Sequence, residues 1–525
     1  TMRGGKMLNS WRMAQLHAQE APDRVYELEE WGALFDRTDD GRILQRDFGG
    51  HRFARLAHVG DRTGLEMIRT LQHRAVALGV EVFMECTVMR LLTDDGRIAG
   101  AVAYWRESGR LAVFRAKAVV LATGGIGKAW KVTSNSWEYT GDGHALALWA
   151  GADLVDMEFV QFHPTGMVWP PSVRGILVTE GVRGDGGVLR NAEGRRFMFD
   201  YIPEMFRSET AETEEEADRW YDDRKNNRRT PDLLPRDEVA RAINTEVKEG
   251  RGSPHGGVFL DIASRKPADY IQRRLPSMYH QFKELADVDI TKEPMEVGPT
   301  CHYVMGGIRG DPDTQAATVP GLFAAGEAAG GMHGANRLGG NSLSDLLVFG
   351  LRAGRYAAEH AATVAGRSVV DPDQVAAAER EALAPFERAD GGVNPYTLQH
   401  ELQDCMQDLV GIIRTEDELK RALERIAALK ERADGVGVEG HRQYNPGWHL
   451  ALDLRSLLTV AECVALAALE RRESRGGHTR DDYPKPDPEL GKVKVVVRVQ
   501  DGEPAVAREP LDELPDDLKR LFEEQ

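Results

Sequence analysis

A glycine-dense loop near the middle of the sequence carries the side chains best suited to chemistry. Part of it reads HGANRLGGNS, so His333, Asn336 and Arg337 lie among glycines whose backbone a ligand could approach closely. A glycine-rich turn before a core helix would explain the glycines, but not one cation beside two hydrogen-bonding side chains. The spacing therefore favours a binding site for an anionic or electron-rich ligand.

A strand must lead into this loop and a helix must leave it. Residues 322–325 are apolar and end just before Glu327, while Asn341 and Ser342 supply N-cap chemistry for a helix that we expect to begin at Leu343. A helix N-terminus offers free N–H groups and the positive end of the helix dipole. Phosphate or the electron-rich edge of a reduced flavin would suit this position, so the loop predicts a flavin site.

A second strand also ends in small residues. The apolar residues 118–122 predict a buried strand that ends in Thr123, Gly124 and Gly125, and a helix is predicted to begin at Asp142. Proteins of the α/β class place ligands at such strand ends. Alone, a strand followed by two glycines is a weak signal.

The composition excludes several classes of function. The 525 residues are 42% hydrophobic, which predicts a globular protein of several domains. A formal charge of -17 argues against nonspecific nucleic-acid binding, so an anionic substrate would need a local cluster of Arg and His. The four cysteines form no C-x-x-C pair, which argues against a disulfide framework and against an iron–sulfur cluster held by this chain alone. Reduced thiols in a cytosolic setting fit best.

Membrane attachment would have to come through a partner. The longest apolar run, residues 457–469, contains Glu462 and is too short to cross a bilayer.

Residues 61–125 are typical of α/β structure. The pattern predicts a helix over 61–78, a strand at 80–83 and a hairpin across residues 94–96. By contrast, residues 208–231 are too polar to bury. We predict a surface excursion there and assign it no chemistry.

Helices replace the glycine loops in the last third of the chain. Apolar residues keep one helical face from 398 to 412, and Thr415 with Glu418 forms a capping box before the next helix. A third helix is predicted from residue 450 to about 473. Three such helices predict an antiparallel bundle, followed by a tail with a strand over 492–499.

Four further motifs narrow the prediction: EFVQFHPTG (158–166), LVTEGVRGDGG (177–187), LLPRDEVARAI (233–243) and PTCHYVMGGI (299–308). In this order, with LATGG before them and HGANRLGGNS after, they resemble the flavoprotein subunit of succinate dehydrogenase and fumarate reductase. The resemblance runs over nearly the whole chain, as far as residue 484. The ending RLGGNSLSDLLVFG favours this branch over L-aspartate oxidase, which belongs to the same superfamily.

The resemblance implies an α/β fold with a Rossmann-like FAD-binding domain interrupted by an α+β capping domain. The FAD-binding domain would span residues 1–157 and return at 298–360, and the capping domain would occupy 158–297. A helical domain at 361–475 and a small tail at 476–525 would follow.

The resemblance also assigns residues to a small dicarboxylate, whose two ends need cations or hydrogen-bond donors. It places His163, Thr179, His302 and Arg337 on the carboxylates, makes Arg236 the proton-transferring residue, and gives Glu180 and Arg183 a proton relay to solvent. Arginine is an unexpected acid or base, and we take that role from the resemblance alone.

For the cofactor, the resemblance assigns Asp142, Glu327, Ser342 and Leu343 to FAD, with Glu327 accepting from a ribose hydroxyl. Asn341 and the strand end Thr123, Gly124 and Gly125 complete the predicted cofactor set. No metal is expected, because His302 beside Cys301 has no second cluster of ligands.

Each of these residues also has a purely structural interpretation. Taken alone, His163 reads as a satisfied core histidine, and Arg236 could pair with Asp237 at a helix start. Glu180 could bond backbone, and Thr179 alone carries no signal. The combination of motifs, and not any single residue, supports the site.

The implied function is interconversion of succinate and fumarate by hydride transfer with FAD. Electrons would pass to a separate iron–sulfur protein, a partner subunit, and through it to a membrane anchor. The chain would then be peripheral on the cytoplasmic face of the cell membrane. One alternative is L-aspartate oxidase or a soluble fumarate reductase. Another is a catalytically inactive fragment that at most binds a partner.

Two family motifs are absent from the sequence. The G-x-G-x-x-G turn that holds the FAD pyrophosphate does not occur near Thr1, and neither does H-T-x-x-A-x-G-G, which carries the covalent flavin histidine. His17 lies in a different pattern and is not a substitute. We therefore expect the natural protein to extend upstream of Thr1, and this chain alone to bind FAD weakly and noncovalently.

Overall fold

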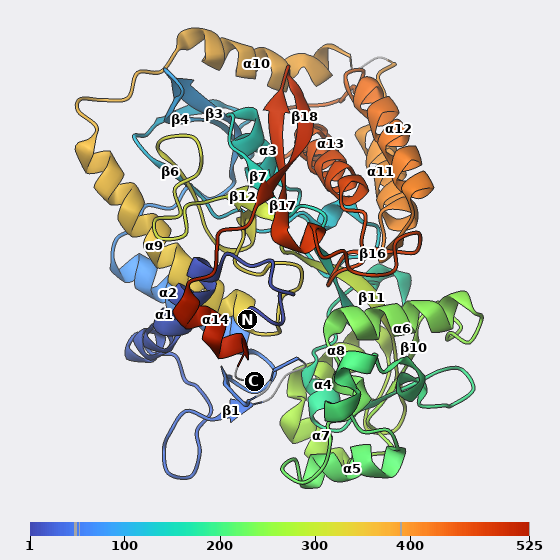
Figure 1. The fold of residues 1–525 in the computed structure, drawn as a ribbon. Helices are drawn as coiled ribbons and strands as arrows, with labels where there is room; N and C mark the ends of the chain where they lie inside the picture. The colour runs from blue at the N-terminus through green and yellow to red at the C-terminus, as the bar shows by residue number, and fades with distance from the viewer. Residues whose placement is uncertain (47–49, 52, 389–390, 524–525) are drawn as a thin grey trace.

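The computed structural model describes residues 1–46, 50–51, 53–388 and 391–523. Figure 1 shows an α/β region that carries the N-terminus, a second lobe built from the green segments, and a group of helices from the later part of the chain. This arrangement confirms the predicted fold class, in which an α+β segment interrupts an α/β region and helices follow. The domain boundaries remain predictions.

The α/β region contains a short parallel pair of strands. Strand β6 (Val119–Leu121) pairs in parallel with β13 (Leu322–Ala324), so both strands end on the same side. These are the two strands predicted to end in ligand-binding glycines. Beside them, β3 (Cys86–Asp94), β4 (Arg97–Trp105) and β5 (Leu111–Arg115) form an antiparallel meander. The β3–β4 turn confirms the predicted hairpin.

A five-stranded sheet joins distant parts of the chain. Its order is β14 (Ala329–Gly330), β12 (Gly307–Arg309), β7 (Leu154–Val155), β17 (Val493–Gln500) and β18 (Glu503–Pro510). The predicted C-terminal strand is β17, and it pairs antiparallel with β7, which immediately precedes the second lobe.

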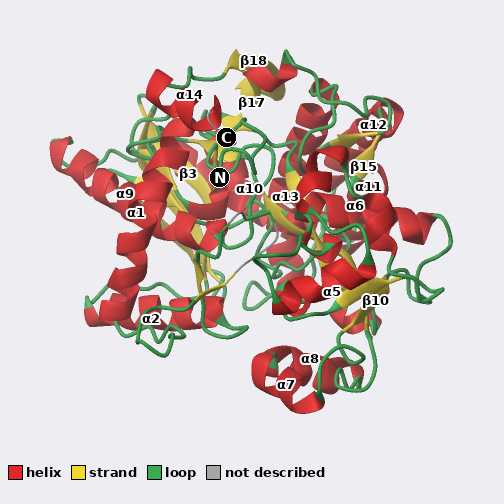
Figure 2. Ribbon diagram, turned by 60° about the horizontal axis from the view of Figure 1, so that its bottom comes forward, coloured by secondary structure: helices red, strands yellow, loops and turns green. Residues whose placement is uncertain are grey.

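The second lobe is built on a four-stranded antiparallel sheet. Its order is β8 (Val160–Met167), β11 (Met295–Val304), β10 (Val258–Asp261) and β9 (Val188–Arg190). Five helices accompany it: α4 (Gly181–Gly184), α5 (Glu214–Asp222), α6 (Arg236–Lys248), α7 (Ala268–Arg274) and α8 (Pro276–Ala286). Buried Met167, Val239 and Val297 belong to one apolar cluster, so α6 packs on this sheet. Figure 2 shows α7 and α8 at the outer edge of the lobe.

Three long helices pack together in the last third of the chain. They are α11 (Pro395–Leu409), α12 (Glu416–Ala433) and α13 (Pro446–Glu470), grouped in Figure 1. The predicted capping box is present, because the Thr415 hydroxyl accepts the Glu418 N–H at 3.3 Å. Leu402, Ile426 and Leu454 are fully buried in the same cluster.

The remaining helices and strands border these units. They are α1 (Trp11–Glu30), α2 (Thr63–Ala77), α3 (Asp142–Trp149), α9 (Asn341–Thr363), α10 (Pro372–Glu387), α14 (Asp516–Glu523), the pair β1 (Gln45–Arg46) and β2 (Leu56–Ala57), and the pair β15 (Ile413–Arg414) and β16 (Thr479–Arg480). In the part of the chain that the structure describes, no helix is both long enough and apolar enough to cross a membrane.

Two predicted features differ from the structure. Residues 80–83 form no strand, and Val80, Val82 and Phe83 are exposed, because no neighbouring strand pairs with them in the described structure. Residues 208–231, predicted to be unburied, contain α5. Its N-cap Thr213 accepts the Glu216 N–H, and Trp220 on α5 is only 4% exposed. Helical periodicity places this one apolar face inward although the segment is polar on average.

Candidate functional site

Strands β8 and β11 bring two of the predicted histidines together. In their antiparallel register His163 lies opposite Thr300, and His302 follows two positions later. The rings of His163 and His302 pack edge to face with centroids 5.3 Å apart. His163 is buried, and its Nε2 has no hydrogen-bond partner among the described residues.

Both histidines are neutral near pH 7. Burial lowers the pKa of His163 and of His302 well below the usual value, and the nearby guanidinium groups lower both further. Nδ1 of His163 lies 3.0 Å from the Thr165 carbonyl oxygen, to which it can donate, and 3.2 Å from the Thr165 nitrogen, from which it can accept. Ser134 Oγ lies 2.8 Å from Nδ1 of His302. The tautomer of each ring decides whether its Nε2 offers a ligand a donor or an acceptor.

The predicted proton-transfer residues also lie together. Arg236, the first residue of α6, donates from Nε to Oε2 of Glu180 at 2.9 Å. Arg183 lies 4.0 Å from the same carboxylate and donates from Nη1 to the Asp232 carbonyl. Burial lowers the pKa of Arg183, although its guanidinium is still charged at neutral pH. Arg183 and Glu180 are both buried, and their role as a relay to solvent stays a prediction.

The guanidinium of Arg337 makes two hydrogen bonds and one cation–π contact. Its Nη1 donates to Ser342 Oγ at 2.9 Å, its Nη2 donates to Gln161 Oε1 at 2.8 Å, and its guanidinium lies 4.4 Å from the Tyr303 ring centroid. Burial lowers the pKa of Arg337 to about 10, so it is still a cation at neutral pH. Its Nε is buried without a partner in the described residues.

Gln161 is a site residue that the sequence interpretation missed. It lies on β8 two positions before His163, and its Oε1 accepts from Arg236 at 3.3 Å and from Arg337 at 2.8 Å. A polar residue in an apolar strand was the available signal, but its partners come from distant segments. Thr179 precedes Glu180, is half-buried, and accepts the Gly181 N–H.

The predicted flavin residues meet where β6 and β13 end. A β-carbon at Gly125 would collide with Oε1 of Glu327, and one at Gly124 would lie 2.9 Å from the Tyr139 ring. Gly124 has φ +74, which glycine adopts without strain. Thr123 lies against Gly143 at the start of α3. The strand pairing therefore brings two segments far apart in sequence to one edge.

The carboxyl group of Glu327 is protonated over much of the neutral range. Burial raises its pKa to about 8, although its Oε1 accepts the Val304 N–H at 3.0 Å. A neutral carboxyl group can both donate and accept, which suits a ribose hydroxyl. The predicted role is thus compatible with the structure.

Helix α9 begins earlier than predicted. It starts at Asn341, and its N-cap is Gly340 at φ 84 with no side-chain cap, so the prediction of Asn341 and Ser342 as caps before Leu343 is wrong. Gly340 can turn the chain without a capping side chain, which frees Ser342 Oγ to accept from Arg337. Asn341 Oδ1 accepts from Arg55, and Leu343 packs in an apolar cluster with Leu28.

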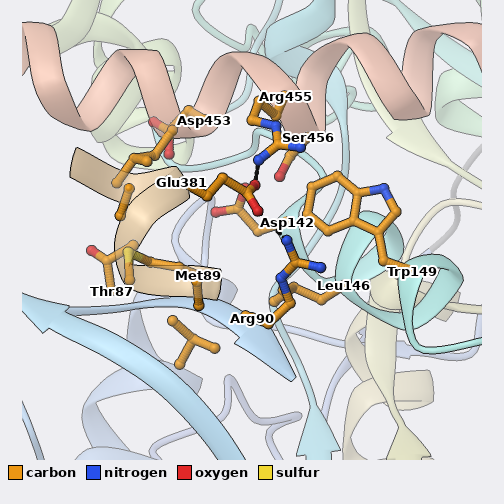
Figure 3. Close-up of a pocket in the computed structure, with 14 residues that line it drawn as sticks. Thr87, Met89, Arg90, Asp142, Leu146, Trp149, Glu381, Asp453, Arg455 and Ser456 are labelled. Carbon is orange, nitrogen blue, oxygen red and sulfur yellow. Dashed lines mark hydrogen bonds and ion pairs between the residues drawn. The ribbon is translucent and has the colours of Figure 1, made fainter. Parts of the chain in front are cut away.

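Asp142 faces a pocket that the other predicted flavin residues do not line. Its carboxyl group lines a pocket with Asp453 and Ser456 of α13 and with Arg90 and Glu381 (Figure 3). Burial raises the pKa of Asp142, and hydrogen bonds to Ser456 and Thr140 oppose this. None of the other predicted flavin residues lines this pocket.

The glycine loop connects the two groups of residues. A β-carbon at Gly339 would lie 3.3 Å from Nη2 of Arg236 and 3.6 Å from Oε2 of Glu180, while Arg337 bonds to the first turn of α9. Glycine-lined strand ends, a helix N-terminus without a side-chain cap and a protonated carboxyl group fit a flavin nucleotide. The residues present therefore fit FAD. The role of each individual residue remains a prediction.

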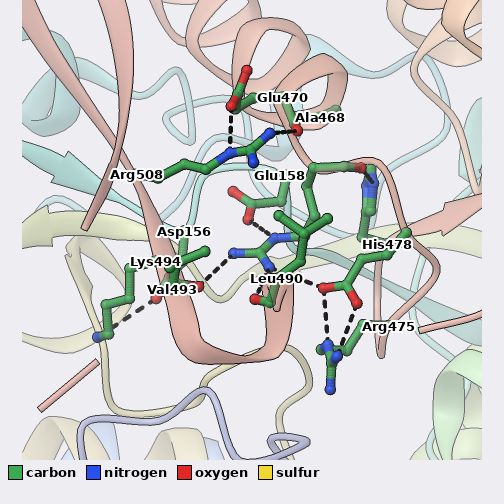
Figure 4. A network of polar contacts seen from close by, with 12 residues as sticks. Asp156, Glu158, Ala468, Glu470, Arg475, His478, Leu490, Val493, Lys494 and Arg508 are labelled. Carbon is green, nitrogen blue, oxygen red and sulfur yellow. Dashed lines mark hydrogen bonds and ion pairs between the residues drawn. The ribbon is translucent and has the colours of Figure 1, made fainter. Parts of the chain in front are cut away.

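A buried ion network anchors the strand that carries His163. Arg471 is fully buried and donates to Glu473 at 3.0 Å and to Glu158, which lies just before β8 and is labelled in Figure 4. Arg414 donates to the Glu158 carbonyl at 2.8 Å. Burial raises the pKa of Glu158 to about 7 despite the ion pair with Arg471. Residues of the C-terminal region thus bind the segment that leads into β8, the strand that carries His163.

Two family descriptions match the chain. Residues 1–343 match the FAD binding domain family, and residues 399–515 match the family described as fumarate reductase flavoprotein C-term. A fumarate reductase (CoM/CoB) subunit from Methanothermobacter marburgensis is 43% identical over 489 residues, which are 93% of this chain and 83% of that protein.

Solved structures agree with these matches. Mycobacterium smegmatis Sdh1, in complex with UQ1, is 61% identical with a TM-score of 0.85, over 99% of this chain and 85% of that one. The FrdA chain of an E. coli quinol fumarate reductase variant is 34% identical with a TM-score of 0.89, over 98% of this chain and 86% of that one.

Proposed function

This chain belongs to the family of succinate dehydrogenase and fumarate reductase flavoprotein subunits, and we propose that it interconverts succinate and fumarate with FAD. The observation that carries the proposal is a cluster of buried nitrogen atoms without hydrogen-bond partners. Nε2 of His163, Nε of Arg337 and Nε of Arg183 all lack a partner among the described residues. Unsatisfied buried donors are costly, and a ligand rich in acceptor oxygens would satisfy them.

The charges of the cluster match a dianion. Arg183, Arg236 and Arg337 oppose the single carboxylate of Glu180, while the two histidines are neutral. The formal charge of this group is therefore positive by two. A dicarboxylate supplies two negative charges at its two ends, and guanidinium groups match carboxylates geometrically.

Each residue has a distinct proposed role. FAD, when bound, supplies a hydride acceptor or donor. His163, His302, Thr179 and Arg337 bind and orient the carboxylates, which places the reacting carbons at near-attack distance. Arg236 moves the proton at the neighbouring carbon, and Glu180 and Arg183 exchange that proton with solvent. His163, Glu180, Arg183 and Arg337 are buried, which helps to exclude water from the reacting atoms.

We also propose that the chain passes electrons to a separate iron–sulfur protein. Through it and a membrane anchor, the chain would work at the cytoplasmic face of the membrane. Support comes from the relatives, which are named as subunits of larger enzymes. All four cysteines are free, and Cys301, Cys405 and Cys463 are buried, so a separate protein would supply the cluster ligands.

Dye reduction tests the proposed activity. The purified protein loaded with FAD should reduce an artificial electron acceptor when given succinate, and should oxidise a reduced dye when given fumarate. Bleaching of the flavin by L-aspartate but not by succinate would instead indicate an aspartate oxidase. A protein that binds FAD and responds to none of the three would exclude the proposed catalytic function.

A further inference from the structure

Gln161 occupies a central position between the two arginines that the proposed function uses. Its side chain is 1% exposed, and its amide makes four hydrogen bonds. Oε1 accepts from Arg236 and Arg337, while Nε2 donates to the Arg337 carbonyl and to Asn336 Oδ1, each at 2.8 Å. The bonding capacity of the amide is fully used.

The orientation of this amide is fixed by its partners. A guanidinium only donates, so the atom that faces Arg236 and Arg337 must be the oxygen. A backbone carbonyl only accepts, so the atom that faces the Arg337 carbonyl must be the nitrogen. Only a side chain with both a carbonyl and an amino group can make this set of contacts.

Gln161 also reaches the backbone segments that carry both arginines. Asn336, which accepts from Gln161, donates from Nδ2 to Asp237 Oδ1 at 2.9 Å. Asp237 is the neighbour of Arg236 at the start of α6, and Asn336 is the neighbour of Arg337 in the glycine loop. Gln161 therefore links strand β8, helix α6 and the loop in one connected network.

The neutrality of Gln161 matters as much as its contacts. The guanidinium groups of Arg236 and Arg337 repel each other, because both are positive and both bond to one acceptor. A carboxylate in place of the Gln161 amide would reduce this repulsion by cancelling part of their charge. An amide oxygen holds both guanidinium groups without removing the positive charge that a dianion requires.

We propose that Gln161 is a positioning residue that sets the separation of Arg236 and Arg337, and thereby selects a dicarboxylate over a monocarboxylate. The proposal rests on the proposed function, because it assumes that both arginines face substrate. Gln161 itself acts through the arginines and does not touch the reacting atoms.

Two variants distinguish the effect of the four hydrogen bonds of Gln161 from the effect of its lack of charge. Gln161→Met keeps the volume and removes all four bonds, and Gln161→Glu keeps an acceptor of the same reach but adds a negative charge. Calorimetry with malonate, a non-reacting dicarboxylate, and with propionate, a monocarboxylate, measures binding without turnover. Gln403→Met is the matched control, because Gln403 is also buried but, within the described parts of the chain, its side chain bonds only to the Lys128 carbonyl.

We expect Gln161→Glu to weaken malonate binding by ~10- to 100-fold, since the site loses one unit of positive charge. Gln161→Met should lower the preference for malonate over propionate by ~10-fold or more, because the two cations no longer keep a fixed spacing. KM for succinate should rise in both variants, while Gln403→Met should leave binding and KM unchanged.

If the ratio of the affinities for malonate and propionate is unchanged in both variants, the inference is overturned. If Gln161→Met unfolds, the near-isosteric Gln161→Glu still tests the proposal. Unchanged malonate affinity in that folded variant would contradict the proposed role. Failure of the proposed function is distinguishable: the unsubstituted protein would then show no succinate or fumarate turnover, whatever the variants do.

Discussion

Nε of Arg236 lies 2.9 Å from Oε2 of Glu180, with both side chains withdrawn from solvent. The carboxylate therefore orients the guanidinium, and Gly339 leaves room beside it, because a β-carbon there would lie 3.3 Å from Nη2. The pair joins the start of α6 to the turn before α4, so one contact links two of the residues that are predicted to transfer the proton.

Replacing Arg236 by lysine should lower kcat far more than it changes KM. Lysine retains the charge but lacks the planar fork that reaches Glu180 and Gln161 together. We expect kcat for succinate oxidation to fall by ~10²- to 10⁴-fold. Arg241→Lys, on the same helix but paired with Glu238, is the control and should retain kcat. Equal losses in both variants would contradict a special role for Arg236.

Replacing His163 by leucine should impair substrate binding. The variant loses the ring nitrogen Nε2, which has no partner among the described residues and is proposed to bond a substrate carboxylate, so KM for succinate should rise by ~10- to 100-fold. The control is His144→Leu, because His144 is also fully buried and both of its ring nitrogens lack partners among the described residues. Steady-state kinetics should show an unchanged KM in the control. A similar rise in both variants would count against carboxylate binding by His163.

Replacing Glu327 by glutamine should affect stability and cofactor binding in opposite directions. Burial raises the pKa of Glu327 from 4.5 to about 8, so the unfolded chain ionises first as pH rises. The contribution of protonated Glu327 to the free energy of unfolding is thus complete below pH 4.5 and is lost as pH rises towards 8. Without FAD, the glutamine variant should be more stable than the parent at about pH 8 and similar at about pH 4.

Denaturant unfolding of the FAD-free protein at the two pH values measures this difference. FAD titration of the same samples should show weaker binding by the glutamine variant, because an amide replaces the predicted ribose partner. A stability difference that does not change with pH would refute the pKa assignment, and unchanged FAD affinity would refute the ribose contact.

Removing Arg471 should destabilise the protein strongly. Arg471→Met leaves Glu158 and Glu473 buried without their shared cation, which costs about 3–5 kcal/mol of the free energy of unfolding. The control is Arg508→Met, because Arg508 pairs with Glu470 at the surface and such pairs contribute about 0–1 kcal/mol. Chemical denaturation of both variants measures the contrast, and equal losses would contradict it.

Elements with local signals could be predicted from the sequence. Thr415 and Glu418 lie three residues apart, so the start of α12 was readable from that pair alone. The strand ends at Gly125 and Glu327 were also readable, because an apolar run before small residues is a local pattern. Their contact needed the parallel pairing of β6 with β13, which no local pattern specifies.

Features that depend on distant partners could not be predicted in this way. Gln161 bonds to Arg236 and Arg337, and nothing within a few residues of it indicates either partner. Arg471 lies in a polar stretch that looks solvent-exposed, yet it is fully buried because Glu158 and Glu473 pair with it. Residues 80–83 show the converse, because an apolar run forms a strand only when another strand pairs with it.

The pairing of β6 with β13 also constrains when the cofactor site can form during synthesis. Val119 must wait for Leu322, its partner in the ladder, to leave the ribosome. At about 5–20 residues per second this takes roughly 10 to 40 s. During that interval Thr123, Gly124 and Gly125 have no opposing carboxyl group, and the nascent chain carries an unpaired apolar strand that chaperones could bind. The two segments that are predicted to hold the flavin can therefore meet only late in the synthesis of the chain.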